Sequence, residues 1–359
     1  MKNKQILYIP GQDISIDDGS GINERNFVNT LLANEVNVLI PKPANTTILS
    51  NTTAYKNLHS TSCTISKKNP FMYLYYIYQQ IGDIKRIVKE NDIAIVIFRL
   101  GFFPLDILYV KKILKKRVFL KHLTFLSSSQ KQNVQLKIVG VIRSLFVRKS
   151  LIDGCDTPSY MTKQYVQKYY KLNNIHIAKN GTPKIEVNRI ELSKRKDYIY
   201  IGRLSNARNT PYLLESFSKS NKSIDIFGFG ELEDLTIEYS KKYENINFHG
   251  KVAYNEIIKI LPNYKFGIDL TYVQTEFGKA SYSQKIAQYL AYGLNAIVVD
   301  CPDNMFIKEN DCGVLFDPEK GDLDTLLNHI EYQRFDPLAI GKYIYADEIV
   351  QSLIQFWKK

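Results

Sequence analysis

Short apolar runs alternate along the chain with stretches whose apolar residues recur at helical spacing. The run Gln5 to Ile9 is followed by Phe27, Val28, Leu31 and Leu32, which fall on one face of a helix. Asp92 to Phe98 (DIAIVIF) is the clearest buried strand. Other strands are expected at residues 36–40, 61–66, 118–120, 175–181, 198–201, 223–227, 246–250, 266–270 and 296–299, and helices at 70–90, 105–114, 134–152, within 156–165 and within 337–359. This alternation predicts parallel sheets covered by helices on both faces.

The length of the chain predicts two domains. A chain of 359 residues exceeds what one ordinary hydrophobic core accommodates. The polar stretch Lys184 to Lys196 has the composition of a linker. We therefore place the first domain at residues 1–184 and the second at 185–344, with a terminal helix at about 345–359.

The charge of the chain narrows the classes of partner. Its formal net charge is +12, which calls for an anionic partner such as nucleic acid, a phosphorylated substrate or an acidic membrane surface. No zinc-finger spacing or RNP-like motif occurs, so we do not expect a nucleic-acid partner. The four cysteines show no metal or disulfide spacing, and no apolar run approaches the roughly 18 residues of a membrane span. A cytoplasmic protein without a metal or other cofactor is expected.

The stretch from Thr271 to Asp300 carries the strongest chemical signal. Ser281 and Ser283 are candidate N-caps for a helix that buries Ile286, Ala287, Leu290 and Ala291 along one stripe. Lys285 and Gln288 fall three residues apart beside that stripe. A helix start offers backbone N–H groups and a positive dipole, and Lys285 adds a full charge. The stretch predicts a phosphate site.

Ser283, Lys285, Gln288, Tyr289, Leu290, Ala291 and Gly293 resemble the S-x-K-x-x-E-Y-L-A-x-G-x-P signature of GT-B glycosyltransferases, the GT4 type especially. Gln288 stands where that family usually has a Glu that holds the nucleotide ribose, and Asn295 stands where it usually has Pro. An amide still hydrogen-bonds ribose hydroxyls, though less strongly than a carboxylate. Glu276 is the candidate for the missing charge.

A second motif resembles the same family. GRLSNARN begins at Gly202 and matches G-R-L-x-x-x-K-N at Arg203 and Asn209, with Arg208 in the Lys position. Fixed cations stabilise the charge that develops on a departing diphosphate, so Arg203, Arg208 and Lys285 form a candidate clamp. The alternative is a charged surface loop.

Two glycine-bearing segments are further binding candidates by resemblance. Gly228 and Gly230 resemble the family loop near the nucleotide base, although such a pair more often marks a tight turn. In the polar loop Gly19-Ser20-Gly21, Glu24 replaces the third glycine of a dinucleotide fingerprint, so that fingerprint fails. The resemblance makes this loop a candidate sugar or acceptor contact.

Two side chains that follow strands are also candidates. Arg99 ends a buried strand, where ligands bind in parallel sheets, and a salt-bridged Arg is equally compatible with that position. His122 follows the next strand, and in the resembled family a His in the corresponding loop approaches the donor sugar. A structural His is the alternative.

Residues 134–152 form an apolar, strongly basic helical pattern with Lys137, Arg143, Arg148 and Lys149. Such a helix can lie on an anionic membrane, or it can be a core helix whose long cations reach solvent. We favour the core helix, while the nearby basic run from Lys111 to Lys121 adds weight to the membrane alternative.

Together the patterns and the resemblance predict a GT-B fold with two facing Rossmann-like sheets, a nucleotide-sugar cleft between them and the terminal helix packed back on the first domain. The implied reaction transfers a sugar, with retention, from a nucleoside-diphosphate sugar, UDP-sugar favoured, to a hydroxyl of a glycan, lipid-linked glycan or glycoprotein, as in bacterial surface polysaccharide synthesis. The donor is a substrate rather than a cofactor, and the inner face of the plasma membrane is a possible location. The alternatives are a catalytically silent binding subunit and a nucleotide-sugar epimerase or phosphorylase. The sequence leaves the sugar, the acceptor and the oligomeric state open.

Overall fold

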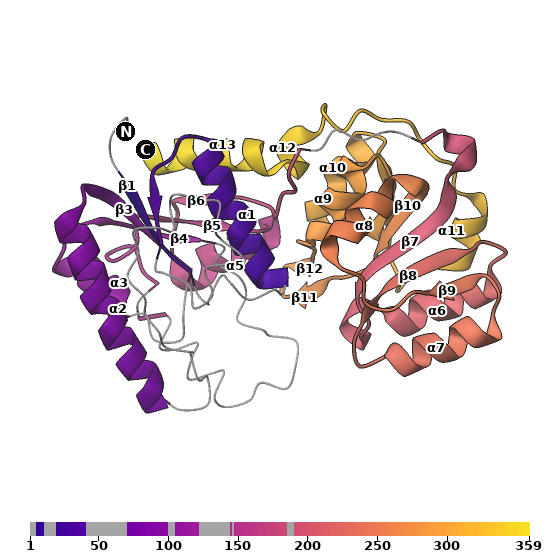
Figure 1. The fold of residues 1–359 in the computed structure, drawn as a ribbon, viewed down its shortest axis with the longest axis horizontal. Coiled ribbons are helices and arrows are strands. Elements are labelled where there is room, and N and C mark those ends of the chain that lie inside the picture. Colours follow the sequence, from indigo (N-terminus) through magenta and orange to yellow (C-terminus); the bar gives the residue numbers. More distant parts are fainter. Residues whose placement is uncertain are drawn as a thin grey trace. The chain divides into compact units, whose positions relative to one another are not determined.

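A computed structural model describes residues 5–10, 19–40, 70–99, 105–121, 144–145, 147–184 and 190–359 (Figure 1). Side chains are described from residue 24 in the first helix and from residue 77 in the second. The expected strand at 61–66, the candidate His122 and most of the basic segment 134–152 lie outside these ranges.

The chain divides into two compact units. The first comprises residues 1–178 and 346–359, and the second comprises residues 179–345. The division after Ala178 lies six residues before the boundary predicted from composition, because the segment from Lys179 onward already packs with the second unit. The last helix belongs to the first unit.

The first unit is built on six parallel strands in the order β2-β1-β3-β4-β5-β6. These strands are β1 (Gln5–Ile9), β2 (Val38–Leu39), β3 (Ile93–Arg99), β4 (Arg117–Lys121), β5 (Gly154–Thr157) and β6 (Ile175–Ile177). The helices are α1 (Gly19–Ala33), α2 (Pro70–Glu90), α3 (Leu105–Lys112), α5 (Tyr160–Tyr170) and α13 (Ala346–Lys358). One apolar core joins the strands to residues of all five helices.

Helix α13 closes that core at the end of the chain. Ile349, Val350, Leu353 and Trp357 lie on one face of the helix and are buried. Trp357 meets the Phe27 ring edge-on at 6.4 Å between ring centroids. The spacing of three or four between these residues is that of an amphipathic helix, so the sequence fixes which face of α13 is buried.

The second unit is also built on six parallel strands, in the order β14-β13-β10-β7-β8-β9. They are β7 (Lys196–Arg203), β8 (Ile224–Phe229), β9 (Ile246–Phe248), β10 (Tyr264–Asp269), β13 (Asn295–Val299) and β14 (Gly313–Phe316). The helices are α6 (Thr210–Lys219), α7 (Glu233–Lys242), α8 (Tyr254–Ile260), α9 (Gln284–Ala291), α10 (Met305–Glu309), α11 (Leu323–His329) and α12 (Gly341–Ile344). Short 3₁₀ turns span Leu192–Lys194, Asn206–Arg208, Leu261–Asn263 and Pro302–Asn304.

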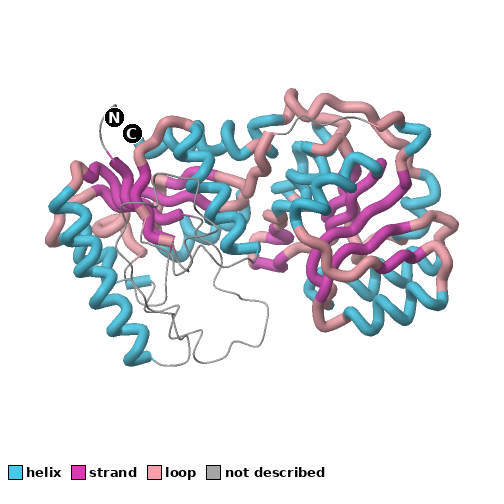
Figure 2. Tube along the Cα trace, in the orientation of Figure 1, coloured by secondary structure: helices cyan, strands magenta, loops and turns pink. Residues whose placement is uncertain are grey.

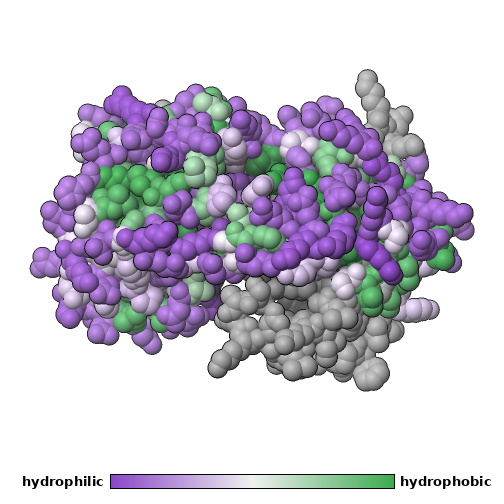
Figure 3. Space-filling model, turned by 180° about the vertical axis from the view of Figure 1, so that it is seen from behind, coloured by the Kyte–Doolittle hydropathy of each residue, from purple (hydrophilic) through white to green (hydrophobic). Residues whose placement is uncertain are grey.

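Helices cover both faces of the second sheet, as Figure 2 shows. Along β7, Tyr198 and Tyr200 point into the core beneath α6 and α11, whereas Ile199 points into the core beneath α8 and α9. This alternation follows from the two-residue period of a strand. Hydrophilic residues predominate on the face drawn in Figure 3, and patches of hydrophobic residues lie among them.

Three expectations are corrected by the described residues. Gly19-Ser20-Gly21 forms the first turn of α1 rather than a loop. Residues 147–152 form turns and not the end of a helix, although Val147 and Leu151 are buried in the core. The glycine-bearing loop at 276–279 is a β-hairpin in which β11 (Val273–Thr275) pairs with β12 (Gly278–Ala280). The other strands predicted within the described ranges are confirmed, with ends that differ by a few residues.

Shortening a side chain of α13 should weaken the first unit. Trp357 is the single tryptophan of the chain and is buried in that unit, so its fluorescence follows the unfolding of the first core. Leu353→Ala should reduce the free energy of unfolding by roughly 2–5 kcal/mol, because it leaves a cavity in a packed core. The matched control is Leu145→Ala, since Leu145 belongs to the same unit and is 52% exposed. Coinciding transitions for Leu353→Ala and the wild type would contradict the packing of α13.

Candidate functional site

The candidate cations of the second unit lie where its strand order reverses. β7 and β10 are neighbours, and the chain proceeds outward from them in opposite directions to β9 and to β14. In such sheets ligands bind outside the carboxyl ends of the strands at this point. Arg203 is the last residue of β7, and Asp269 is the last residue of β10.

Lys285, in the first turn of α9, reaches over the end of β7. Its Nζ lies 3.3 Å from Asp269 Oδ1 and 4.7 Å from the centroid of the Tyr200 ring. A Cβ built on Gly202 would lie 3.0 Å from this Nζ, so Gly202 leaves room for the ammonium. The Lys285 side chain is 14% exposed and Asp269 is fully buried. The pair is an almost buried ion pair at the centre of the sheet edge.

Several cations and hydrogen-bond donors at this edge of the sheet act on the Asp269 carboxylate. Burial by itself raises its pKa, but the Lys285 ammonium, the Ser283 hydroxyl and Arg208 together hold the pKa below its ordinary value. The backbone N–H of Thr271 also donates to Asp269 Oδ1 at 3.1 Å. Arg208 and Lys285 therefore act on the same carboxylate, which stays ionised.

Arg203 points to a different partner. Its side chain is 62% exposed and pairs with Glu231 at 3.3 Å. Glu231 directly follows the glycine-bearing end of β8. Arg203 is next in sequence to Gly202, against which Lys285 lies, so the three cations share one edge of the sheet. Lys285 pairs with Asp269 directly, and Arg208 acts on that carboxylate through its charge. An exposed ion pair of this kind is weak and can exchange partners easily.

Gly228 and Gly230 have a structural explanation. A Cβ on Gly228 would lie 1.9 Å from the carbonyl oxygen of Gly202, and a Cβ on Gly230 would lie 2.2 Å from that of Leu204. The ends of β7 and β8 therefore approach too closely for any side chain at these positions. The tight-turn alternative accounts for both glycines, and contact with a nucleotide base stays a prediction.

Gln288 lies one turn after Lys285 and is 8% exposed. Its Nε2 is 3.3 Å from the hydroxyl of Tyr254, the first residue of α8. Glu276 is exposed at the turn of the β11–β12 hairpin. The structure thus gives Gln288 a neighbour on α8 that the sequence did not indicate.

The two candidate N-caps behave differently from the prediction. Ser283 occupies the N-cap position of α9, but its side chain makes no capping hydrogen bond. Ser281 is 3% exposed, and its hydroxyl has no hydrogen-bond partner among the described residues. Neither hydroxyl therefore satisfies the backbone N–H groups at the start of α9.

In the first unit, Arg99 pairs with Glu24, which is fully buried. Lys121 lies 3.6 Å from the same carboxylate, and the Tyr8 hydroxyl donates to it. Burial raises the pKa of Glu24, but the positive charges of Lys121 and Arg99 hold it below its ordinary value. The salt-bridge alternative holds for Arg99. From the sequence, Glu24 stood out only as the residue that replaces the third glycine of a dinucleotide fingerprint. Its burial next to two cations was therefore not predicted.

The structure describes no side-chain contacts for the remaining candidate residues of the first unit. Gly19, Ser20 and Gly21 are placed only as helical backbone, and His122 lies outside the described residues. Within the described ranges, no three His, Cys, Asp or Glu side chains gather in a way that could hold a metal ion. In those ranges, too, every helix is too short or too polar to cross a bilayer.

Neither a protein-family model nor a curated protein matches the sequence. Solved structures match it over nearly its whole length. The lipopolysaccharide outer core galactosyltransferase WaaB, in its apo form, aligns with a TM-score of 0.66 at 17% identity over 98% of both chains. HepE of Anabaena in complex with UDP aligns with a TM-score of 0.70 at 11% identity over 99% of both chains.

A glycosyltransferase from Rickettsia africae aligns with a TM-score of 0.69 at 14% identity, over 100% of this chain and 99% of its own. At these identities the likeness establishes the fold. The prediction of an α/β protein with two doubly wound parallel sheets, the architecture of GT-B glycosyltransferases, is confirmed, and each of these sheets has six described strands.

Removing the charge of Asp269 should destabilise the second unit. Asp269→Asn leaves Lys285 almost buried without its partner, which costs roughly 3–5 kcal/mol in such pairs. The folded pKa of Asp269 is depressed, so its contribution is complete above the unfolded pKa of about 3.9 and is lost as the pH falls below it. The difference in unfolding free energy between the wild type and Asp269→Asn should thus shrink below about pH 4.

The control for this series is Asp300→Asn, since Asp300 is exposed at the end of β13. Denaturant unfolding at each pH measures the difference. A difference for Asp269→Asn that stays constant down to pH 3 would show that Asp269 is not held ionised by its neighbours.

Proposed function

We propose that this chain is a glycosyltransferase of the GT4 type that uses a nucleoside-diphosphate sugar. The observation that carries the proposal is the meeting of Arg208, Lys285 and the start of α9 at the point where the second sheet reverses its strand order. Such a point binds ligands in open parallel sheets, and a helix start with two cations favours a diphosphate. The fold shared with glycosyltransferase structures agrees with this proposal.

In the proposed reaction the bond between the anomeric carbon and the diphosphate breaks, the oxygen of an acceptor hydroxyl forms the new bond to that carbon, and the hydroxyl proton passes to the departing diphosphate. Negative charge grows on the leaving diphosphate, so Arg208 and Lys285 stabilise the transition state more than the bound substrate. Asp269 holds Lys285 in place before the donor binds. Arg203 exchanges its exposed partner Glu231 for a phosphate oxygen. No residue in this scheme calls for a metal.

Gln288 suits a ribose in spite of replacing the family glutamate. Its amide nitrogen donates to Tyr254, which leaves the amide oxygen as the free acceptor for a ribose hydroxyl. Glu276, at the hairpin turn, remains our candidate for an added negative charge.

We propose further that the donor is a UDP-sugar and that the configuration at the anomeric carbon is retained. The acceptor is then a hydroxyl of a glycan, glycolipid or glycoprotein, as in bacterial surface polysaccharide synthesis. The solved structure of HepE with UDP and glucose supports the choice of UDP, and the galactosyltransferase WaaB supports a surface-glycan acceptor. We propose a cytoplasmic protein that docks on an anionic membrane, because the chain carries a net charge of +12. Vesicle association that falls with rising salt would support docking, and indifference to anionic lipid would contradict it.

Arg203 is the safest position for testing the donor site, because it is exposed and its loss does not disturb the core. Arg203→Ala should weaken UDP binding about 10- to 100-fold, since a charge-assisted hydrogen bond is worth about 1.5–3 kcal/mol. Calorimetric titration with UDP, GDP and ADP measures the affinities. The matched control is Lys219→Ala, because Lys219 is an exposed cation of the same unit on α6. Equal UDP affinity in Arg203→Ala and Lys219→Ala would remove Arg203 from the donor site.

Turnover separates the transferase from a silent binding subunit, the alternative that Gln288 favours. The wild type should consume nucleotide sugar only when an acceptor is present, and proton NMR of the product should show the anomeric configuration of the donor. A protein that binds UDP tightly but never releases it from any UDP-sugar, with any acceptor, would be the binding subunit. An inverted product would contradict retention, and consumption without an acceptor would favour an epimerase.

A further inference from the structure

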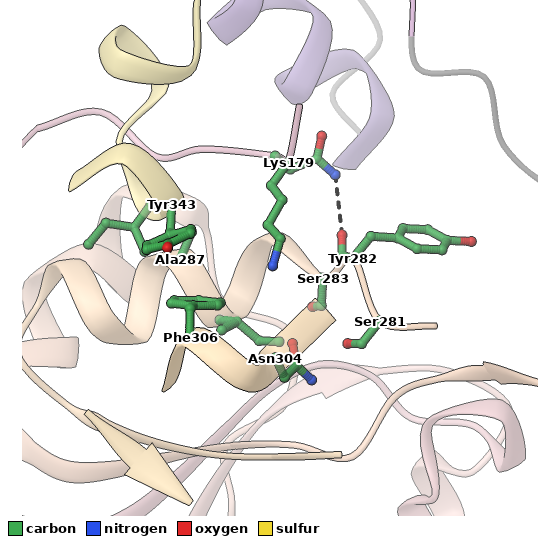
Figure 4. A pocket seen from close by; sticks show the side chains of 11 residues that line it. Lys179, Ser281, Tyr282, Ser283, Ala287, Asn304, Phe306 and Tyr343 are labelled. Carbon is green, nitrogen blue, oxygen red and sulfur yellow. Dashed lines mark hydrogen bonds between the residues drawn. The ribbon is translucent and has the colours of Figure 1, made fainter. Parts of the chain in front are cut away.

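A cavity that is partly open to solvent lies in the second unit beside the start of α9 (Figure 4). Lys179 and Asn180 line it from the first residues of the unit, and Tyr343 and Ile344 line it from the last. These two segments are joined, because the Thr182 N–H donates to the Ile344 carbonyl at 2.8 Å. The cavity therefore borders both segments at which the chain passes between the two units.

One wall of the cavity carries a buried hydroxyl without a partner. Ser281 lines the cavity, is 3% exposed, and its Oγ has no hydrogen-bond partner among the described residues. Figure 4 shows this hydroxyl turned toward the side of the cavity where Asn304 lies. An unpaired buried hydroxyl is unfavourable, so its place on a cavity wall indicates a ligand that supplies the missing hydrogen bond.

The same cavity contains an ammonium group. The Lys179 side chain extends into it between Phe306 and Ser283, as Figure 4 shows. Its Nζ donates to the carbonyl of Asp303 and lies 4.5 Å from the centroid of the Phe306 ring. Burial lowers the pKa of Lys179, and the Asp303 carboxylate opposes that effect. An anion in the cavity would restore the favourable surroundings that burial removes.

The start of α9 adds its backbone to this wall. The Ser283 side chain makes no capping hydrogen bond to α9, and its hydroxyl lies instead beside Asp269. The first N–H groups of this eight-residue helix are therefore not capped by that side chain. Their partial positive charge favours an anion.

We propose that this cavity is a binding site for a small oxyanion, a phosphate group in particular, separate from the cations that surround Asp269. Lys179, Ser281 and the start of α9 supply the donors, and Phe306 and Tyr343 supply the apolar wall. Ile286 and Ala287 line the cavity from the buried stripe of α9, whereas Lys285 extends over Tyr200. Ser283 touches both places, so occupancy of the cavity bears on the donor site.

The test titrates the full chain with inorganic phosphate and measures its affinity by calorimetry, with sulfate as a second probe. Lys179→Met should weaken phosphate binding about tenfold or more, and Ser281→Ala about three- to tenfold. Ser281→Ala removes a single oxygen from a small residue, so it remains informative if Lys179→Met fails to fold. Lys219→Ala, which removes an exposed cation on α6 outside both sites, should keep the phosphate affinity of the wild type.

Unchanged phosphate affinity in both cavity variants would overturn the proposal, as would the absence of phosphate binding to the wild type. Loss of phosphate binding in Arg203→Ala alone would place the anion at the donor cations instead.

Free phosphate and the terminal phosphate of a nucleotide share this chemistry, and titration of UDP at saturating phosphate distinguishes the two sources. Independent binding assigns the cavity to a free anion, and competition that Lys179→Met relieves assigns it to the nucleotide. If phosphate binds but UDP does not, the proposed transferase function is contradicted and the proposed oxyanion site is retained.

Discussion

The ion pair between Lys285 and the fully buried Asp269 is the interaction on which the second unit's site depends. A carboxylate with no exposed surface remains ionised only where cations and donors surround it. Here those groups come from three elements: the end of β10, the 3₁₀ turn after β7 and the start of α9. The Asp269 carboxylate therefore stays ionised only because these three elements meet. An anion that binds at this point would encounter cations that are already held in position.

The first unit repeats this arrangement with different residues. Glu24 on α1 is buried beside the ends of β3 and β4, where Arg99 and Lys121 reach its carboxylate. In this sheet too the strand order reverses next to β1, which carries Tyr8. In both units a buried acid thus organises cations at the edge where ligands bind in parallel sheets. In the second unit the start of α9 lies at that edge.

The sequence predicted those features that depend on local pattern. The helical stripe of α9 determines which of its side chains are buried, and this stripe was predicted correctly. The strand order depends on contacts between residues far apart in sequence, which no local pattern encodes. The hairpin at Gly278 was missed because a three-residue strand has too few positions to show a period.

For the site, the sequence identified the cations but not the acids that hold them. Lys285, Arg203 and Arg208 lie in recognisable motifs, whereas Asp269 and Glu24 read as ordinary polar residues. Their burial is visible only once the strands are in place. The same holds for Gly228 and Gly230, whose packing against the end of β7 follows from strand pairing. Charge motifs are therefore easier to predict than the partners that position them.

A crystal structure of the chain with bound UDP tests the central claim most directly, because it locates the diphosphate relative to the ion pair. The account predicts phosphate oxygens within about 3 Å of Lys285 Nζ and of the Arg208 guanidinium, with Asp269 still beside Lys285. A diphosphate bound elsewhere, with Lys285 still enclosed between Asp269 and Tyr200, would contradict it.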